Sequence, residues 1–418
     1  MILPFILMLM SIALMPFIHL HWWERHFPKV AMVLAVITIA YYVFGLGEGR
    51  RMLHVAHEYL RFMTLIGSLF VVTGGIHLDV KGEAKPWINC LFLFIGAMLA
   101  NIIGTTGASI LLIRPWIRLN KYRITTYHIV FFIFVVSNVG GCLTPIGDPP
   151  LFLGYIKGVP FWWVLQKCWA AWAVTVTGLI AIFYIIDRMD FSRAPRQVRE
   201  EKTRQEIWTI EGWGNGGFLV LILGAVFIKT PPWLGESLML MGAACSWVST
   251  PKRIHQINAF NFHPLREVGW LFVGIFATMV PALDFLEIHA KQLGLNSEMQ
   301  LFWFTGLLSG ALDNAPTYLT FLTAAMGRYD LSLNDPGHVL AFLGQYEREL
   351  IAISLGAVFF GAVTYIGNAP NLMVKSIADH AKVKTPGFFA YLLKYALPLL
   401  LPLLALVCLL FFSRHRVF

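Results

Sequence analysis

The sequence predicts an all-α polytopic membrane protein with inverted-topology repeats. Hydrophobic residues make up 57% of the 418 positions and charged residues only 13%, roughly half the charged share of a soluble protein. Apolar stretches of about 17–25 residues, long enough to cross a bilayer, recur along the chain. Two further apolar segments, 126–157 and 349–380, are broken by glycine, proline and polar residues. We therefore expect about ten transmembrane helices, two re-entrant hairpins and two broken helices.

The uninterrupted apolar stretches give the expected continuous spans. These lie near 1–20, 30–46, 58–77, 162–187, 216–232, 235–250, 267–288 and 387–412. Residues 1–20 lack a basic leading region and a small-residue cleavage site, so we interpret them as the first span and not as a signal peptide. The expected organisation is a first repeat over 1–187, a basic cytoplasmic linker over 188–215 and a second repeat over 216–418.

Two more apolar segments, 88–113 and 299–326, carry helix-breaking residues near their centres. The first is interrupted by Asn101 and by the run 104–107, and the second by Ser309 and by the run 313–316. Each segment could be a full span. Alternatively, each is a hairpin that enters and leaves on one side of the membrane, because arms of about 12 residues are too short to span. The sequence leaves both alternatives open.

Basic residues gather in three loops, and these set the expected orientation. Loops rich in Lys and Arg face the cytoplasm, so all three are expected there. The clusters are Arg114, Arg118, Lys121 and Arg123; Arg188, Arg193, Arg196, Arg199, Lys202 and Arg204; and Lys252, Arg253 and Arg266. The same bias explains the net charge of +9 without nucleic acid as a partner. Segment 126–157 then runs from inside to outside and 349–380 from outside to inside, with both termini outside.

The two broken segments align directly with one another. Without a gap, Gly141, Thr144, Ile146, Gly147, Asp148 and Pro150 fall opposite Gly361, Thr364, Ile366, Gly367, Asn368 and Pro370. The hairpin segments align less closely, with 104–107 opposite 313–316. Breakers at matching places in two halves of opposite topology are typical of secondary transporters, whose substrate site lies near the bilayer midplane.

The breaks supply hard oxygen ligands at membrane depth. Half-helices that begin or end there present partial charges and free carbonyl groups to the site. Oxygen ligands, and carboxylates above all, suit hard cations. The candidate cation- and proton-binding residues are Thr105, Asn138, Thr144 and Asp148 in the first half and Asp313, Asn314, Thr364 and Asn368 in the second.

The two carboxylates, Asp148 and Asp313, favour a cation as the substrate. Two acids in one poorly hydrated pocket repel one another, so a proton or a bound cation is expected to neutralise them. None of the four breaks contains Arg or Lys, which a dicarboxylate or citrate would require. Asp313 could instead cap the hairpin tip beside Asn314, because Asp is a good N-cap residue. Asn138 could likewise only cap a helix end.

Other classes of site find no support in the sequence. The five cysteines show no metal-ligand spacing, no phosphate-binding glycine motif follows a strand, and no nucleophile–base motif is present. We therefore expect no enzyme activity, no cofactor, and no metal beyond transported Na+. Membrane lipid and a small inorganic cation are the expected partners.

The motifs as a whole resemble those of the NhaD-type sodium/proton antiporters. These belong to the ion-transporter superfamily, together with the citrate-transporter-like and arsenite-permease-like families. The matching runs are 101–107, 137–150, 312–317 and 367–371, and the resemblance covers roughly 60–410. It implies a homodimer in which one domain moves against a scaffold. The dicarboxylate branch carries Ser-Asn-Thr triplets in its hairpins and breaks, and this chain lacks them.

These observations together predict a secondary transporter of the bacterial inner membrane that exchanges Na+ (or Li+) for H+. In this prediction Asp148 and Asp313 carry the proton and the cation. One alternative is a Na+-coupled importer of citrate or another organic anion, with half-helix N-termini binding the carboxylates. A second is an arsenite-type anion or metalloid efflux permease driven by a separate ATPase subunit.

Overall fold

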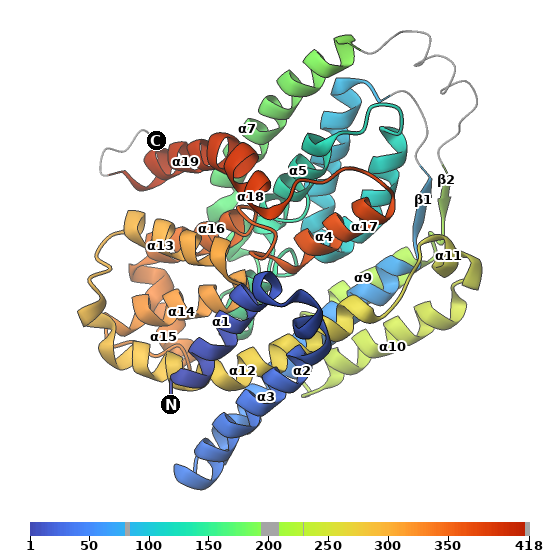
Figure 1. Ribbon diagram of the computed structural model, residues 1–418. Coiled ribbons are helices and arrows are strands. Elements are labelled where there is room, and N and C mark those ends of the chain that lie inside the picture. The colour runs from blue at the N-terminus through green and yellow to red at the C-terminus, as the bar shows by residue number, and fades with distance from the viewer. Residues whose placement is uncertain (80–83, 194–208, 229, 414–418) are drawn as a thin grey trace.

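The computed structural model describes residues 1–79, 84–193, 209–228 and 230–413, and these are almost entirely helical (Figure 1). The α-helices are α1 Leu3–Ile18, α2 Leu20–Ala40, α3 Gly49–Gly74, α4 Pro86–Leu119, α5 Thr126–Val135, α6 Pro149–Ile156, α7 Trp163–Arg193, α9 Asn215–Ala225, α10 Leu234–Ser249, α11 Lys252–Ile257, α12 His263–His289, α13 Glu298–Ala311, α14 Asn314–Gly327, α15 Pro336–Gln345, α16 Glu347–Phe360, α17 Ala369–His380, α18 Phe388–Tyr391 and α19 Leu401–Phe412. Shorter elements are the π-helices η1 Tyr41–Gly45 and η4 Leu392–Leu400, the 3₁₀ helices η2 Val139–Leu143 and η3 Ala290–Leu293, and the strands β1 His77–Asp79 and β2 Thr209–Glu211.

This architecture confirms an all-α polytopic membrane protein. Within the described residues, seven helical stretches are long and apolar enough to cross a bilayer. Two spans are longer than the sequence predicts: α2 begins at Leu20 instead of near 30, and α7 continues to Arg193 beyond the expected end at 187. The expected spans ended where charged residues begin, but charged residues do not stop a helix. Most of the basic linker, 194–208, lies outside the described residues.

Helix α4 is a hairpin and not a single span. Its chain turns at Gly104, whose φ of 77° and ψ of 155° are non-helical and suit glycine. The rings of Phe92 and Trp116 lie 5.3 Å apart, whereas 24 residues of straight helix would separate them by about 36 Å. At the open end, Asn89 Nδ2 donates to Asn120 Oδ1 over 2.8 Å. The second hairpin consists of α13 and α14, which pack together across a short connection at Asp313.

Both broken helices are held open by close glycine contacts. In the first, α5 and η2 precede an extended turn, and α6 starts immediately after Asp148. A Cβ added to Gly147 would collide with the carbonyl oxygen of Gly141, and one added to Gly367 would lie 2.6 Å from the carbonyl oxygen of Gly361. These aligned glycines are therefore required by backbone packing in each half. Helix α5 is buried after its first two residues, with every residue from His128 to Val136 at 0% exposure.

Contacts between helix ends define one face of the molecule, the linker face. It comprises the ends near 75–79, 120–126, 187–192, 209–215, 250–262 and 379–386. Strand β1 pairs antiparallel with β2 there, in the register His77 opposite Glu211. The hydroxyl of Thr126 donates to the carbonyl of Lys384 over 3.1 Å. The mouth of the first hairpin lies on this face, since Arg123 donates to the carbonyl of Ala84 over 2.6 Å.

The remaining ends form the opposite face, near 45–58, 155–163, 226–236, 284–298 and 327–349. Lys157 Nζ donates to Glu58 Oε1 over 2.7 Å, and Trp163 Nε1 donates to Glu347 over 3.3 Å. The mouth of the second hairpin lies here, where Arg328 Nη1 is 3.3 Å from Glu349 Oε2. The two hairpins therefore enter from opposite faces, as inverted repeats require.

The helices divide into two bundles. The scaffold bundle contains α1, α2, α3, α9, α10 and α12, in which α12 packs on α2 and α3, and α10 packs on α3 and α9. The site bundle contains the two hairpins, the two broken helices, α7 and α19. The bundles meet where α3 contacts α4 and α6 and where α12 contacts α14. Each bundle draws equivalent elements from both halves, and the division into repeats at 187 and 216 stays a prediction.

Candidate ion-binding site

Asp148 lies at the point where the hairpins and the broken helices converge. Its Oδ1 accepts hydrogen bonds from Thr105 Oγ1 and Asn368 Nδ2, both over 2.8 Å, and its Oδ2 accepts one from Asn314 Nδ2 over 2.6 Å. The side chain is 1% exposed. Three of the sequence-predicted residues, from both hairpins and from the other broken helix, therefore bind one carboxylate. Among the described residues, every side chain that donates to Asp148 is neutral.

Asn138 connects the two broken helices behind this carboxylate. Its Nδ2 donates to Asn371 Oδ1 and to the carbonyl of Ile133, each over 2.8 Å. Its Oδ1 lies 3.3 Å from Asn368 Nδ2, the same amide that binds Asp148. The Nδ2 of Asn371 donates in turn to carbonyl groups of the second break. The predicted role of Asn138 as a helix-end group is consistent with these contacts, which orient Asn368.

Thr144 and Thr364 make the same contact in the two halves. Thr144 Oγ1 donates to the carbonyl of Asn101 over 2.5 Å, and Thr364 Oγ1 donates to the carbonyl of Gly310 over 2.7 Å. Each oxygen also accepts the backbone N–H three residues later, from Gly147 over 3.1 Å and from Gly367 over 3.2 Å. Both threonines thus attach a break to the first arm of the neighbouring hairpin. Their hydroxyl groups are occupied by the backbone and do not reach Asp148.

Asp313 begins the second arm of its hairpin as an N-cap. Its Oδ1 accepts the backbone N–H of Ala315 over 3.0 Å, and its carbonyl accepts the hydroxyl of Thr317 over 2.9 Å. None of the described hydrogen bonds joins it to Asp148. The structure therefore places Asp313 beside the site through its neighbour Asn314, in the capping geometry that the sequence left as an alternative.

A small cavity adjoins Asp148 on the side of α3. It is bounded by the tip of the first hairpin and the first break, and by the apolar side chains Phe62, Leu65, Ile66, Leu69, Phe70 and Phe152. Its volume of about 30 Å³ is enough for a water molecule or a small ion. A further acceptor is available at the site, because Asn314 Oδ1 is buried and has no hydrogen-bond partner among the described residues. A buried amide oxygen without a partner is a candidate cation ligand.

Comparison with known proteins identifies the family of the chain. A family model described as "Putative citrate transport" matches residues 1–412. The chain belongs to this family of membrane transporters. Its function is therefore that of a transporter and not of an enzyme.

Three relatives of the transporter cover most of its length at low identity. The "46 kDa membrane protein" of Mycobacterium leprae is 24% identical over 341 residues, which are 76% of this chain and 77% of that protein. "Sodium/proton antiporter 2" of Arabidopsis thaliana is 24% identical over 270 residues, 60% of this chain and 62% of that protein. An uncharacterized transporter of Mycobacterium tuberculosis is 23% identical over 318 residues, 72% of this chain and 71% of that protein.

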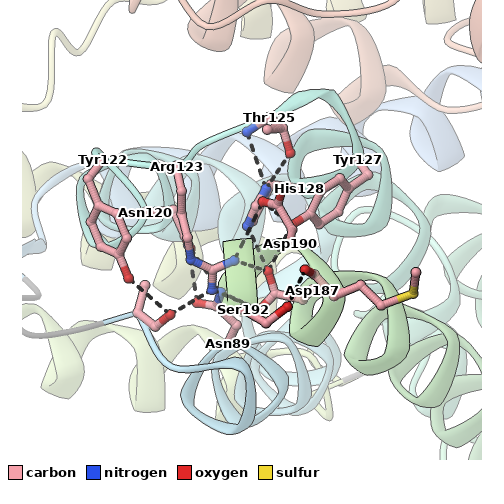
Figure 2. Close-up of polar contacts among 12 residues, drawn as sticks. Asn89, Asn120, Tyr122, Arg123, Thr125, Tyr127, His128, Asp187, Asp190 and Ser192 are labelled. Carbon is pink, nitrogen blue, oxygen red and sulfur yellow. Dashed lines mark hydrogen bonds and ion pairs between the residues drawn. The ribbon is translucent and has the colours of Figure 1, made fainter. Parts of the chain in front are cut away.

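The transporter also contains a buried charged cluster that the sequence did not reveal (Figure 2). Asp187, on α7, forms a two-pronged ion pair with Arg123, whose Nη2 lies 2.9 Å from Asp187 Oδ2. Tyr127 donates its hydroxyl to Asp187 over 2.9 Å, and Asn89 Nδ2 donates over 3.0 Å. Arg123 is only 8% exposed. The sequence predicts Arg123 only as a loop charge that sets topology, whereas in the structure it also pairs with Asp187 on α7.

His128 completes this cluster. Its Nδ1 accepts the backbone N–H of Thr125 over 3.2 Å, which leaves the proton of the neutral ring on Nε2. That nitrogen is 3.2 Å from Asp187 Oδ1, and both side chains are fully buried. A lone acid at the end of the apolar span 162–187 was the only sequence signal for the cluster. It joins the mouth of the first hairpin to α5 and α7, away from the candidate site.

Proposed function

We propose that the transporter exchanges Na+ (or Li+) for H+ through Asp148. The observation that carries the proposal is a fully buried carboxylate bound by three neutral donors, one from each hairpin and one from the other broken helix. Such a group is stable in a membrane only when a proton or a cation neutralises it. The same carboxylate therefore holds H+ and Na+ in turn, and the two ions compete.

The side chains around Asp148 could bind the cation and release the proton during exchange. A cation that enters the site takes the place of the proton on Asp148, and the proton leaves to water on the same side. The oxygen of Asn314 faces no donor and is ready to bind the cation, while rotation of the Asn368 amide would present a second oxygen. Thr105 supplies a third oxygen, from its hydroxyl. Asp313, through its charge, lowers the electrostatic cost of the cation.

The size of the cavity supports a small cation. Its volume of about 30 Å³ suits a dehydrated monovalent ion or one water molecule and is far below the several hundred Å³ of a typical small-molecule pocket. A relative carries the name "Sodium/proton antiporter 2", which agrees with this choice. We also propose a location in the bacterial inner membrane, with the linker face in the cytoplasm, because that face carries the basic loops.

Transport of citrate or another organic anion is the second candidate, favoured by the description of the family. The helices α6 and α17 both begin at the site, and their N-termini would attract carboxylates. The uncompensated charge of Asp148 opposes this candidate. An anion would have to bind together with neutralising cations, so its transport would require Na+.

Proton flux in reconstituted vesicles tests the two candidates. We would measure Na+-dependent proton release at three pH values, with and without citrate or a dicarboxylate. Exchange predicts release without any anion, and an apparent Na+ affinity that rises roughly tenfold per pH unit when one proton is displaced. Flux that requires an organic anion, with uptake of that anion, would favour the second candidate.

A further inference from the structure

The bundles are joined across the seam between α3 and α6 by a buried ion pair. The pair consists of Glu58 on α3 and Lys157 at the end of α6, and we call it the first latch. The two residues are 4% and 8% exposed, and the distance from Lys157 Nζ to Glu58 Oε1 is 2.7 Å. Lys157 also lies at the C-terminus of α6, where a cation is favoured by the helix dipole. One turn further along α3, Arg61 pairs instead with Glu236 over 2.8 Å, within the scaffold bundle.

The first latch closes the path from the opposite face to Asp148. Glu58 shares one face of α3 with Phe62 and Leu65, which reach the cavity beside Asp148. Phe62 is fully buried, and its ring lies 6.2 Å from that of Phe152 on α6. From the opposite face inwards, α3 and α6 are therefore joined first by the ion pair and then by this aromatic contact.

The second half contains the same acidic motif on α12. The offset that places Gly104 opposite Asp313 also places His54 and Glu58 opposite His263 and Glu267. Each histidine lies one turn before its glutamate, with Nε2 of His54 3.2 Å from Glu58 and Nδ1 of His263 3.6 Å from Glu267. The motif therefore recurs on the two scaffold helices that contact the site bundle.

The two copies differ in what they contact. The side chain of Glu58 is 5% exposed, whereas that of Glu267 is 39% exposed. Among the described residues, no ion pair joins α12 to α17, the second-half counterpart of α6. The offset of the broken helices places Ile377 opposite Lys157, and the nearest basic residue of α17 is Lys375, which pairs with Asp379 of its own helix over 2.6 Å. The seam on the linker face is therefore without a latch in this conformation.

We infer that the transporter alternates between two latches, Glu58–Lys157 and Glu267–Lys375, which close the opposite-face and linker-face seams in turn. The inference rests on the proposed alternating exposure of Asp148. Inverted repeats reach their second conformation when the two halves exchange arrangements. That exchange separates Glu58 from Lys157 and brings Glu267 to α17, where Lys375 leaves Asp379. Each latch stabilises the state in which its own seam is closed. The relative stability of the two latches therefore determines from which face Asp148 is accessible.

Thiol accessibility tests the latches without reference to the transported solute. We would replace the five native cysteines by alanine, introduce Leu65→Cys in the cavity, and label from each face of oriented vesicles with a membrane-impermeant reagent. Glu58→Gln should raise the rate of labelling from the opposite face about tenfold and lower it from the linker face. Glu267→Gln should shift both rates the other way. The matched control, Arg61→Met, breaks a pair within the scaffold bundle and should shift neither rate.

Two double variants distinguish loss of the ion pair from loss of folding. The double variant Glu58→Gln/Lys157→Met removes both charges and should shift labelling as Glu58→Gln does, while the exchange Glu58→Lys/Lys157→Glu should restore the original rates. The inference is overturned if both glutamate variants shift labelling in one direction, if Arg61→Met matches Glu58→Gln, or if the folded double variant leaves labelling unchanged. Because labelling needs no substrate, these outcomes are independent of whether Na+ is the transported ion.

Discussion

The two broken helices have the same backbone arrangement but different chemistry. In each, a threonine attaches the break to a hairpin arm, and two glycines pack against one another. At the position before the second half-helix, however, the first half has Asp148 and the second has Asn368, with φ of −143° and −154°. The two residues also contact one another directly over 2.8 Å. The repeat therefore builds a symmetric frame, and one difference between an acid and its amide places a carboxylate in only one of the two breaks.

Removing that difference should have the largest effect. Asp148→Asn makes the two breaks alike and leaves no group that can exchange a proton for a cation. We expect Na+-dependent proton flux to fall at least a thousandfold, which corresponds to about 4 kcal/mol. The double variant Asp148→Asn/Asn368→Asp returns one carboxylate to the same contact and should recover part of the flux. Flux in vesicles, at matched protein content, is the measurement, and normal flux in Asp148→Asn would contradict the proposed site.

The mouths of the hairpins give the next largest expected effect. The first mouth depends on the fully buried Asp187–Arg123 pair, and the second on Arg328 and Glu349, with side chains 14% and 10% exposed. Asp187→Asn leaves a buried guanidinium without its counter-charge, so we expect a loss of about 3 kcal/mol or more in the free energy of unfolding. Glu349→Gln should cost less because water reaches that pair. Thermal unfolding in detergent would compare them, and a larger loss for Glu349→Gln would refute the ranking.

The equivalent threonines should respond equally to substitution. Thr144→Val and Thr364→Val each leave a backbone carbonyl and an N–H group without their hydroxyl partner, at a cost of about 2 kcal/mol. Unfolding curves of the two variants should coincide if the frame is symmetric. A cost confined to one variant would show that the two breaks contribute unequally, and Ser at either position should retain stability because it keeps the hydroxyl.

Substitutions of Asp313 distinguish its charge from its role as an N-cap, and they have the smallest expected effect on flux. Asn is also a good N-cap, so Asp313→Asn should keep the hairpin stable while it removes the charge beside the site. We expect about a tenfold loss of flux, or about 1.4 kcal/mol. Asp313→Ala should add a loss of stability of about 1 kcal/mol. Unchanged flux in Asp313→Asn would assign this residue to capping alone.

Sequence patterns predicted the parts of the site that local residues determine. Clusters of glycine, proline and polar residues interrupt the apolar stretches, so both breaks and the residues beside them could be found without a structure. The choice between a span and a hairpin could not, because a single positive φ at Gly104 decides it. The Arg123–Asp187 pair was also out of reach. Its members are 64 residues apart in sequence, and Arg123 already had a local explanation as a basic loop residue.

The burial of α5 has a consequence for the assembly of the protein in the membrane. The eight residues of α5 from His128 to Val135 are fully enclosed by protein, so this part of the helix does not rest against lipid in the folded protein. Its neighbours include α7, which is made later, and its buried His128 requires Asp187 on that helix. Two of its other neighbours, α17 and η4, belong to the second half of the chain. We therefore expect α5 to become fully enclosed only after both halves have entered the membrane.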